Sequence, residues 1–230
     1  MLERRHYENI NTLSTAVADF AANRLHTTLQ QNDVASLVIP GGNTPRFYLP
    51  ALARLPINWQ RVMITLSDER WVDTRSQDSN EFLARNYFLN HMNREAHFIS
   101  LKTTHDHPSL ALLTINDRLS QLPLPINLAI LGLGEDGHIA SIFPGHSINS
   151  ASNSLCEVAV PPIAPSIRIS LAFSLLASSD HIIVVVTGQN KKKRLEQFID
   201  SQDPQIPFIR LVQQTHSPIT IFEFYYSENL

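Results

Sequence analysis

Cysteine is almost missing from this chain, since Cys156 is the only one in 230 residues. A single thiol excludes an intramolecular disulfide framework and a zinc site built from cysteines. It is typical of a protein kept in a reducing compartment, and we expect Cys156 to be a small core residue. No apolar run approaches the roughly 20 residues that cross a bilayer, and the basic N-terminal stretch lacks the apolar segment of a signal peptide. The sequence therefore predicts a cytoplasmic protein.

A large excess of positive or negative charge is missing as well. The formal net charge is −3, which gives neither nucleic acid nor an anionic membrane surface an electrostatic reason to bind. Hydrophobic residues make up 43% of the chain and charged residues 17%, which is typical of a folded globular protein. Internal repeats and long low-complexity linkers are also missing, so we expect a single domain over residues 1–230. For its assembly we expect a monomer or a weak homo-oligomer.

Short runs of apolar, β-branched residues alternate with helical patterns along the chain. Runs such as IIVVV are apolar throughout, which predicts strands buried on both faces. The alternation is typical of an α/β fold, with a mostly parallel sheet flanked by helices on both faces. The predicted strands are 34–39, 61–66, 98–101, 126–131, 167–171, 181–187 and 219–225. The predicted helices are 12–30, 45–55, 80–90, 109–121, 174–178 and 190–200.

In open α/β sheets, ligands bind beyond the carboxyl ends of the strands, so the residues that follow each strand are informative. The first predicted strand is followed by PGGNTP (40–45). Gly41 and Gly42 allow a sharp turn and a close backbone approach to a ligand, and Thr44 can cap a helix that begins at Pro45. Free N–H groups at such a helix end suit a phosphate, whereas the alternative is a tight turn that binds nothing. No Gly-Lys-Ser/Thr follows, which argues against a nucleoside triphosphate.

The second predicted strand leads into the charged segment SDERWVDTRSQDSN (67–80). Asp68, Glu69 and Arg70 lie at the strand end, where charged side chains are either solvated or organised in a site. The functional interpretation places Asp68 and Arg70 around a polar substrate. Ser79 is a candidate N-cap for the helix that follows.

The fourth predicted strand is followed by GLGEDGH (132–138), which satisfies the dinucleotide-binding pattern G-x-G-x-x-G. Such a turn opens a long helix and has an acidic residue about 20 positions further on. Pro144 interrupts any helix here after a few residues, so we expect no nicotinamide or flavin cofactor. His138 instead titrates near neutral pH and has Asp136 two residues away, which makes it a candidate for moving protons.

The strand before the last is followed by GQNKKKRLEQF (188–198). Lys191 falls in the first turn of the predicted helix, where a cation opposes the helix dipole unless an anion binds there. The alternatives are a solvated helix face or a basic targeting patch. Arg168, at the start of RISLAF, is a second candidate cation. His105 and His107 lack the further ligands of a metal site, and no G-x-S-x-G elbow supports a serine hydrolase.

Taken together, these strand-end motifs resemble those of the 6-phosphogluconolactonase family. The larger group also includes glucosamine-6-phosphate deaminase and ribose-5-phosphate isomerase. The matching strings are PGGNTP, SDERWV with its later DSN, LGLGEDGHIASIFPGH, and RISLAF followed by VTGQNKK, in the family's order. The resemblance implies a Rossmann-like fold of the ribose-5-phosphate isomerase and CoA-transferase type.

The string SIFPGH separates two chemistries within this group. Deaminases resemble the sequence through DGHIA but continue with an asparagine and a glutamate, where this chain has Ile142 and Phe143. The carboxylate that their ring-opening and proton-transfer chemistry needs is therefore missing. DER in place of the deaminases' DEY points the same way. Asn43 and Ile139 depart from the serine or threonine common in lactonases, and both can still act through their backbones.

The resemblance implies hydrolysis of 6-phospho-D-glucono-1,5-lactone to 6-phospho-D-gluconate, a step of the oxidative pentose phosphate pathway. His138 would be the general base for a water that attacks C1. Arg70 would orient the substrate or stabilise developing charge, and Asp68 and Asp136 would fix hydrogen bonds around the site. The residues expected to hold the phosphate are Gly41, Gly42, Asn43, Thr44, Arg168 and Lys191. No metal or organic cofactor is expected.

Two other functions stay open at this point. One is a glucosamine-6-phosphate deaminase or sugar-phosphate isomerase, against which Phe143 argues. The other is a non-catalytic sensor that binds a sugar phosphate in the same pocket and has less need for His138.

Overall fold

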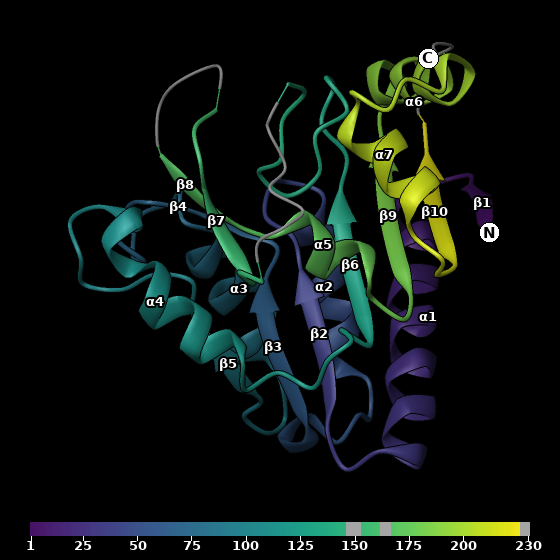
Figure 1. Ribbon diagram of the computed structural model, residues 1–230. Coiled ribbons are helices and arrows are strands. Elements are labelled where there is room, and N and C mark those ends of the chain that lie inside the picture. The colour runs from purple at the N-terminus through teal and green to yellow at the C-terminus, as the bar shows by residue number, and fades with distance from the viewer. Residues whose placement is uncertain (146–152, 162–166, 226–230) are drawn as a thin grey trace.

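The computed structural model describes residues 1–145, 153–161 and 167–225. Within these residues, seven parallel strands form a large sheet in the order β1-β10-β9-β6-β2-β3-β5 (Figure 1). The strands are β1 (Leu2–Tyr7), β2 (Ala35–Ile39), β3 (Val62–Leu66), β5 (His97–Ile99), β6 (Leu128–Gly132), β9 (Ile182–Thr187) and β10 (Ile219–Phe224). The predicted α/β architecture with a mostly parallel sheet is confirmed.

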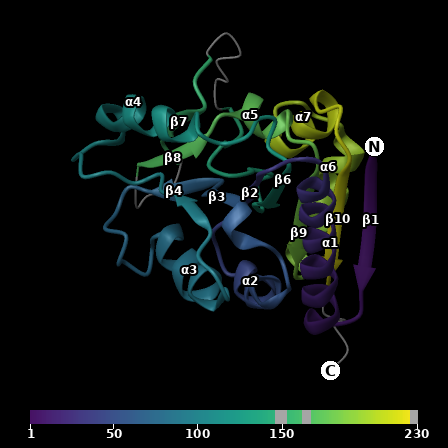
Figure 2. The same cartoon turned by 90° about the horizontal axis from the view of Figure 1, so that it is seen from below.

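Helices cover both faces of the large sheet. Seen from below, α1, α2 and α3 lie on one face, and α4, α5 and α7 lie on the other (Figure 2). All five residues of β2 are buried, as are the first five of β9, because both faces of these strands are covered. The helices are α1 (Ile10–Gln31), α2 (Pro45–Arg54), α3 (Asn80–Tyr87), α4 (Pro108–Leu119), α5 (Phe173–Ala177), α6 (Gln189–Ser201) and α7 (Pro207–Gln214).

The long helix α1 shows how local sequence fixes an element. The side chain of Asn9 accepts hydrogen bonds from two N–H groups of the first turn, which otherwise have no partner in a helix. Leu13, Val17, Ala21 and Leu25 recur at helical spacing and are fully buried. The apolar stripe therefore packs α1 against the sheet, as the periodicity predicts.

The strand order places a crevice at the carboxyl ends of two central strands of the large sheet. The chain runs outward from β2 to β3 and β5, whereas from β6 it runs the opposite way to β9 and β10. Because β2 and β6 are neighbours, the connections that leave their carboxyl ends diverge. PGGNTP follows β2 and GLGEDGH follows β6, so the two glycine-rich motifs flank this crevice.

A second, smaller sheet was not expected from the sequence. It is antiparallel, with the order β4-β8-β7, and consists of β4 (Asp68–Arg70), β7 (Cys156–Ala159) and β8 (Arg168–Leu171). The predicted strand 167–171 exists, but it pairs here and not in the large sheet. Ser67 joins the two sheets, since its N–H donates to Ile39 and its carbonyl accepts from Leu171.

Four elements were missed, two because their residues are mostly charged and two because they are short. The strand β1 is a half-exposed edge strand with alternating charges, and β4 is made of three charged residues. Strand β7 and helix α7 are only four and eight residues long. Cys156 in β7 is 1% exposed, which confirms it as a core residue. In the part of the chain that the structure describes, no helix is both long and apolar enough to span a membrane.

Candidate functional site

A cavity of about 310 Å³ opens at the carboxyl ends of β2, β3, β6 and β9. It lies at the crevice that the strand order creates. All of the predicted site residues except Asp136 line it: Gly41, Gly42, Asn43, Thr44, Asp68, Arg70, His138, Arg168 and Lys191. Motifs spread over most of the sequence are thus brought together at one place.

His138 and Asp136 form a hydrogen-bonded pair beside the cavity. The imidazole Nδ1 lies 2.5 Å from Asp136 Oδ1, and the backbone N–H of His138 donates to the same oxygen at 3.1 Å. Partial burial acts to raise the pKa of Asp136, but the bonds from His138 outweigh it and the pKa is lowered. An ionised carboxylate accepts a hydrogen bond from Nδ1–H, which leaves Nε2 as the nitrogen of the neutral imidazole with a free lone pair.

The glycine pattern around His138 allows this pair to form. A Cβ on Gly134 would lie 2.1 Å from His138 Nδ1 and 2.7 Å from Asp136 Oδ1. The backbone N–H of Gly134 also donates to the carbonyl of His138, which closes the loop. No helix occurs in residues 133–145, so this turn lacks the long helix of a dinucleotide-binding site. The lack of a side chain at Gly134 therefore leaves room for the pair of His138 and Asp136.

Phe143 contacts two residues that line the cavity, His138 and Arg168. Its ring centroid lies 4.8 Å from that of His138, and the guanidinium of Arg168 lies 5.5 Å from the same ring. The side chain is 8% exposed. An aromatic ring therefore contacts both the imidazole of the His138–Asp136 pair and the guanidinium of Arg168.

Arg70 and Arg168 face each other across the small sheet. They are direct partners in the antiparallel pairing of β4 and β8, a position where like charges destabilise a sheet. The Nε atoms of both are buried and lack a hydrogen-bond partner within the described residues. Burial lowers the pKa of Arg168, the charge of Asp68 opposes this, and the charge of Arg70 adds to it. Two such guanidiniums form a site suited to an anion.

Asp68 is buried and already supplied with protein donors. Its Oδ2 accepts from Ser141 Oγ at 2.6 Å, and Oδ1 accepts from Ser67 Oγ at 3.0 Å and from Asn80 Nδ2 at 3.3 Å. The side chain is 6% exposed and Glu69 is 0% exposed. The alternative that this charged segment is a solvated loop is therefore wrong for both carboxylates.

The glycine loop after β2 differs from its prediction in one respect. Pro45 is the first residue of α2, as expected, but Thr44 has helical backbone angles and its side chain does not cap the helix. Its hydroxyl instead lies 3.1 Å from the hydroxyl of Thr187, which ends β9 and offers a partner. The predicted side-chain cap is wrong, and no side chain caps the first turn of α2.

Lys191 lies in the first turn of α6, as predicted. Gly188 precedes this helix with a φ of 94° and provides no capping side chain. Burial lowers the pKa of Lys191, and the charge of Glu135 opposes this effect. Both the half-buried cation and the uncapped helix end favour an anion in the cavity.

Several residues in or beside the cavity were missed in the sequence. Asn80 lines it and directly follows Ser79, whose predicted capping role is confirmed by a hydrogen bond from the N–H of Phe82. Thr187 contacts the lining residue Thr44 and ends a predicted strand, so the strand-end rule pointed to it. Tyr48 on α2 lines the cavity too, but nothing in its helical pattern separates it from a core residue.

The chain is similar to known proteins along most of its length. The family model described as glucosamine-6-phosphate isomerases/6-phosphogluconolactonase matches residues 8–221. The chain belongs to this family. The family description covers two activities, so membership alone does not choose between them.

The relatives within the glucosamine-6-phosphate isomerase/6-phosphogluconolactonase family are more specific. A 6-phosphogluconolactonase of Pseudomonas putida is 32% identical over 92% of this chain and 88% of its own length. Another, from Neisseria meningitidis serogroup B, is 32% identical over 95% of this chain and 96% of its own. The crystal structure of a 6-phosphogluconolactonase from Shewanella baltica is 29% identical, covers 98% of both chains and has a TM-score of 0.92. The recognition of the lactonase resemblance is confirmed.

Proposed function

We propose that this chain hydrolyses 6-phospho-D-glucono-1,5-lactone to 6-phospho-D-gluconate, as in the oxidative pentose phosphate pathway. The observation that carries the proposal is one cavity lined by both His138 and Arg168, with Asp136 bonded to His138 and Phe143 in contact with both lining residues. The lactonase relatives support it. A cytoplasmic location, a single domain and a monomer or weak homo-oligomer belong to the same proposal.

The phosphate of the substrate binds at the cationic side of the cavity. Arg168 and Lys191 supply the charge, and the backbone of the glycine loop with the uncapped start of α2 supplies N–H donors. The loop residues concerned are Gly41, Gly42, Asn43 and Thr44. Holding this remote group orients the lactone carbonyl toward His138, which uses binding energy to reduce the entropy cost of the reaction.

His138 acts as the general base. Its Nε2 removes a proton from a water molecule as the water oxygen attacks C1, and Asp136 stabilises the imidazolium that results. The tetrahedral intermediate then breaks the bond between C1 and the ring oxygen. The imidazolium returns its proton to that oxygen as it leaves, so the histidine ends neutral. Proton transfer of this kind typically contributes about 10²–10⁴-fold to a rate.

Arg70 orients the substrate or stabilises the negative charge that develops on the carbonyl oxygen. Its Nη1 donates to the carbonyl of Asp78 at 2.6 Å, and its buried Nε has no hydrogen-bond partner within the described residues. Asp68 is not a base in this scheme, because three protein donors already engage its carboxylate. It holds Ser141, and with it the segment that follows His138.

One position argues against the deaminase alternative. Phe143 fills the place between His138 and Arg168 in which the resembled deaminases carry their glutamate. The direct test compares two assays on the purified protein: hydrolysis of the phospholactone, corrected for its spontaneous rate, and release of ammonia from glucosamine-6-phosphate. We expect the first activity alone. Ammonia release would support the deaminase, and binding of 6-phosphogluconate without any turnover would support the sensor.

The His138→Ala substitution tests the assigned base. Hydrolysis should fall by about 10²–10⁴-fold while 6-phosphogluconate still binds, because the phosphate contacts are untouched. The exposed His105 provides a matched control, and His105→Ala should leave turnover unchanged. Near-wild-type turnover in His138→Ala would remove the histidine from this role.

A further inference from the structure

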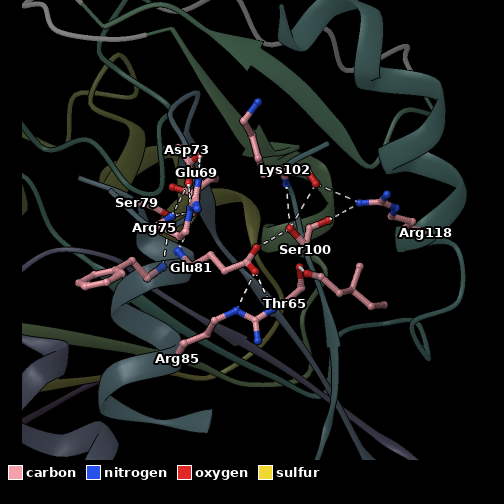
Figure 3. A network of polar contacts seen from close by, with 12 residues as sticks. Thr65, Glu69, Asp73, Arg75, Ser79, Glu81, Arg85, Ser100, Lys102 and Arg118 are labelled. Carbon is pink, nitrogen blue, oxygen red and sulfur yellow. Dashed lines mark hydrogen bonds and ion pairs between the residues drawn. The ribbon is translucent and has the colours of Figure 1, made fainter. Parts of the chain in front are cut away.

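Glu69 is a buried carboxylate that takes no part in the steps described above. It is 0% exposed, and its two oxygens accept four hydrogen bonds of 2.7–2.9 Å. Oε1 accepts from the backbone N–H groups of Arg70 and Asn80. Oε2 accepts from the hydroxyl of Ser79 and from the N–H of Glu81 (Figure 3). The carboxylate thus joins strand β4 to the first turn of helix α3.

These bonds do more than cap a helix. Ser79 already caps α3 by accepting from the N–H of Phe82, so Glu69 adds to a cap that exists without it. None of the four donors carries a formal charge, and burying a carboxylate without a cation is costly. Four donors that converge on two oxygens do, however, fix the positions of the residues that bear them. Glu69 is therefore better placed to set geometry than to stabilise the helix.

Asn80 transmits this geometry to the cavity. Its Nδ2 donates to the carbonyl of Asp68 at 2.8 Å and lies 3.3 Å from Asp68 Oδ1. The amide packs directly against the glycine loop, because a Cβ on Gly41 would lie 1.9 Å from Asn80 Oδ1. Asn80 thereby sets the separation between Asp68 and the loop after β2, which are two walls of the cavity.

We propose that Glu69 is a positioning residue that fixes the start of α3 and, through it, the places of Arg70, Asp68 and Gly41 around the substrate. Glu69 itself does not line the cavity, so it acts only through these residues. The kinetic part of this inference rests on the proposed function. Displacing a substrate-holding group by about 1 Å can cost a factor of about 10² in rate.

Glu81 provides a matched control on the same helix. It is 4% exposed, and its Oε1 accepts from Arg85 at 2.7 and 2.9 Å. Its Oε2 accepts from Ser100 at 2.5 Å. The side chain of Glu81 therefore ties α3 to Ser100 in the region after β5, as Figure 3 shows, and Glu81 does not line the cavity. A Glu81→Gln substitution loosens the helix without touching a cavity wall.

The experiment compares Glu69→Gln with Glu81→Gln in the full chain. Glutamine keeps the size of the side chain but replaces one carboxylate oxygen with an NH₂ group. Two of the four donors that surround Glu69 therefore lose their acceptor. Steady-state hydrolysis of the phospholactone and the Kd of 6-phosphogluconate are measured on both variants, below the onset of thermal unfolding. The amide signals of glycines in a ¹H–¹⁵N spectrum give a substrate-free readout, because the chain has only seven glycines.

We expect KM and the Kd of 6-phosphogluconate to rise at least about tenfold in Glu69→Gln, with a smaller loss in kcat. The effect on KM exceeds that on kcat because the residues that move hold the substrate. The proposed proton-transfer residues, His138 and Asp136, lie on the loop after β6 and stay in place. The Gly41 amide signal should shift in the same variant. Glu81→Gln should leave all of these within about twofold of wild type.

Two results would overturn the inference: unchanged binding and an unchanged Gly41 signal in Glu69→Gln, or equal losses in Glu81→Gln. A wild-type protein without lactonase activity would contradict the proposed function alone. In that case the Gly41 signal still decides the role of Glu69, since it needs no substrate.

Discussion

The two sheets of this molecule differ in the residues that form their strands. The central strands of the large sheet are apolar and covered on both faces, so burial of hydrocarbon holds them in register. The small sheet instead carries Asp68, Glu69, Arg70 and Arg168 on two short strands, where hydrogen bonds and charges decide the geometry. A change in the large sheet should therefore alter stability, whereas a change in the small sheet should alter ligand binding.

The loop after β6, a strand of the large sheet, carries the proposed proton-transfer residues His138 and Asp136. Gly134→Ala should reduce kcat by about 10²-fold, because the added methyl would lie 2.1 Å from His138 Nδ1 and would displace the imidazole from Asp136. Gly132→Ala is the control, since a Cβ at Gly132 meets no atom within 4 Å. The measurement is kcat on both variants at equal folded fraction. Equal activities would show that the close approach at Gly134 does not position the histidine.

In the small sheet, we expect the facing side chains of Arg70 and Arg168 to lower the stability of the ligand-free protein and to strengthen substrate binding. Arg168→Met should raise KM by about tenfold or more, because the phosphate loses a charged donor. The same change should raise the Tm of the ligand-free protein, since it removes a like charge opposite Arg70 and a cation that burial disfavours. Thermal unfolding with and without 6-phosphogluconate checks both signs. A lower ligand-free Tm than wild type, with the exposed Arg75→Met unchanged, would contradict the repulsion.

The carboxylate of Glu69 should make the small sheet sensitive to pH. Burial raises its pKa to about 7 from an ordinary 4.5, against hydrogen bonds from Asn80, Glu81, Ser79 and Arg70 that lower it. The folded state then binds more protons than the unfolded state between these values. The free energy of unfolding should fall as pH rises from about 4.5 to about 7, by up to about 1.4 kcal/mol per pH unit from this group.

Urea unfolding across that range provides the measurement. Glu69→Gln removes the titrating group, so its stability should fall less steeply with pH than that of wild type. The comparison uses the slopes and not the absolute stabilities, because the substitution also alters the hydrogen bonds. Identical slopes would place the folded-state pKa of Glu69 close to its ordinary value.

The smallest effect is expected in the middle of the large sheet. Ile183→Val in β9 should lower the free energy of unfolding by about 0.5–1.5 kcal/mol, since it removes one buried methyl group from a fully buried side chain. The kcat and KM should stay unchanged. Denaturant unfolding and steady-state kinetics on the same preparation test this separation. A change in KM would mean that the scaffold and the site are coupled more tightly than the two sheets suggest.

Much of the fold could be predicted because apolar periodicity reports burial. The strands around β2, β6 and β9 and the helix α1 carry that signal directly. β1 and β4 could not be predicted, because charged residues on short or edge strands look like loops until a partner strand is known. The strand-end rule brought most of the site together, since it concerns topology and not side-chain orientation.

The pairing of arginines across the small sheet escaped prediction for the same reason. Arg70 and Arg168 are far apart in sequence, and their register depends on antiparallel pairing that no local pattern specifies. Thr44 shows the opposite case, in which a sound local rule predicts a cap but a distant hydroxyl, that of Thr187, takes the side chain.

The outermost strand of the large sheet has a consequence for how the protein is made. β1 pairs in parallel with β10 along its whole length, from Leu2 opposite Ile219 to Tyr7 opposite Phe224. During synthesis, β1 must therefore wait until β10 has been made before it has a neighbour in the large sheet. Only β1 and β10 wait in this way, because β9 already pairs with β6, and a chain cut short before β10 leaves β1 unpaired and one edge of β9 open to other chains.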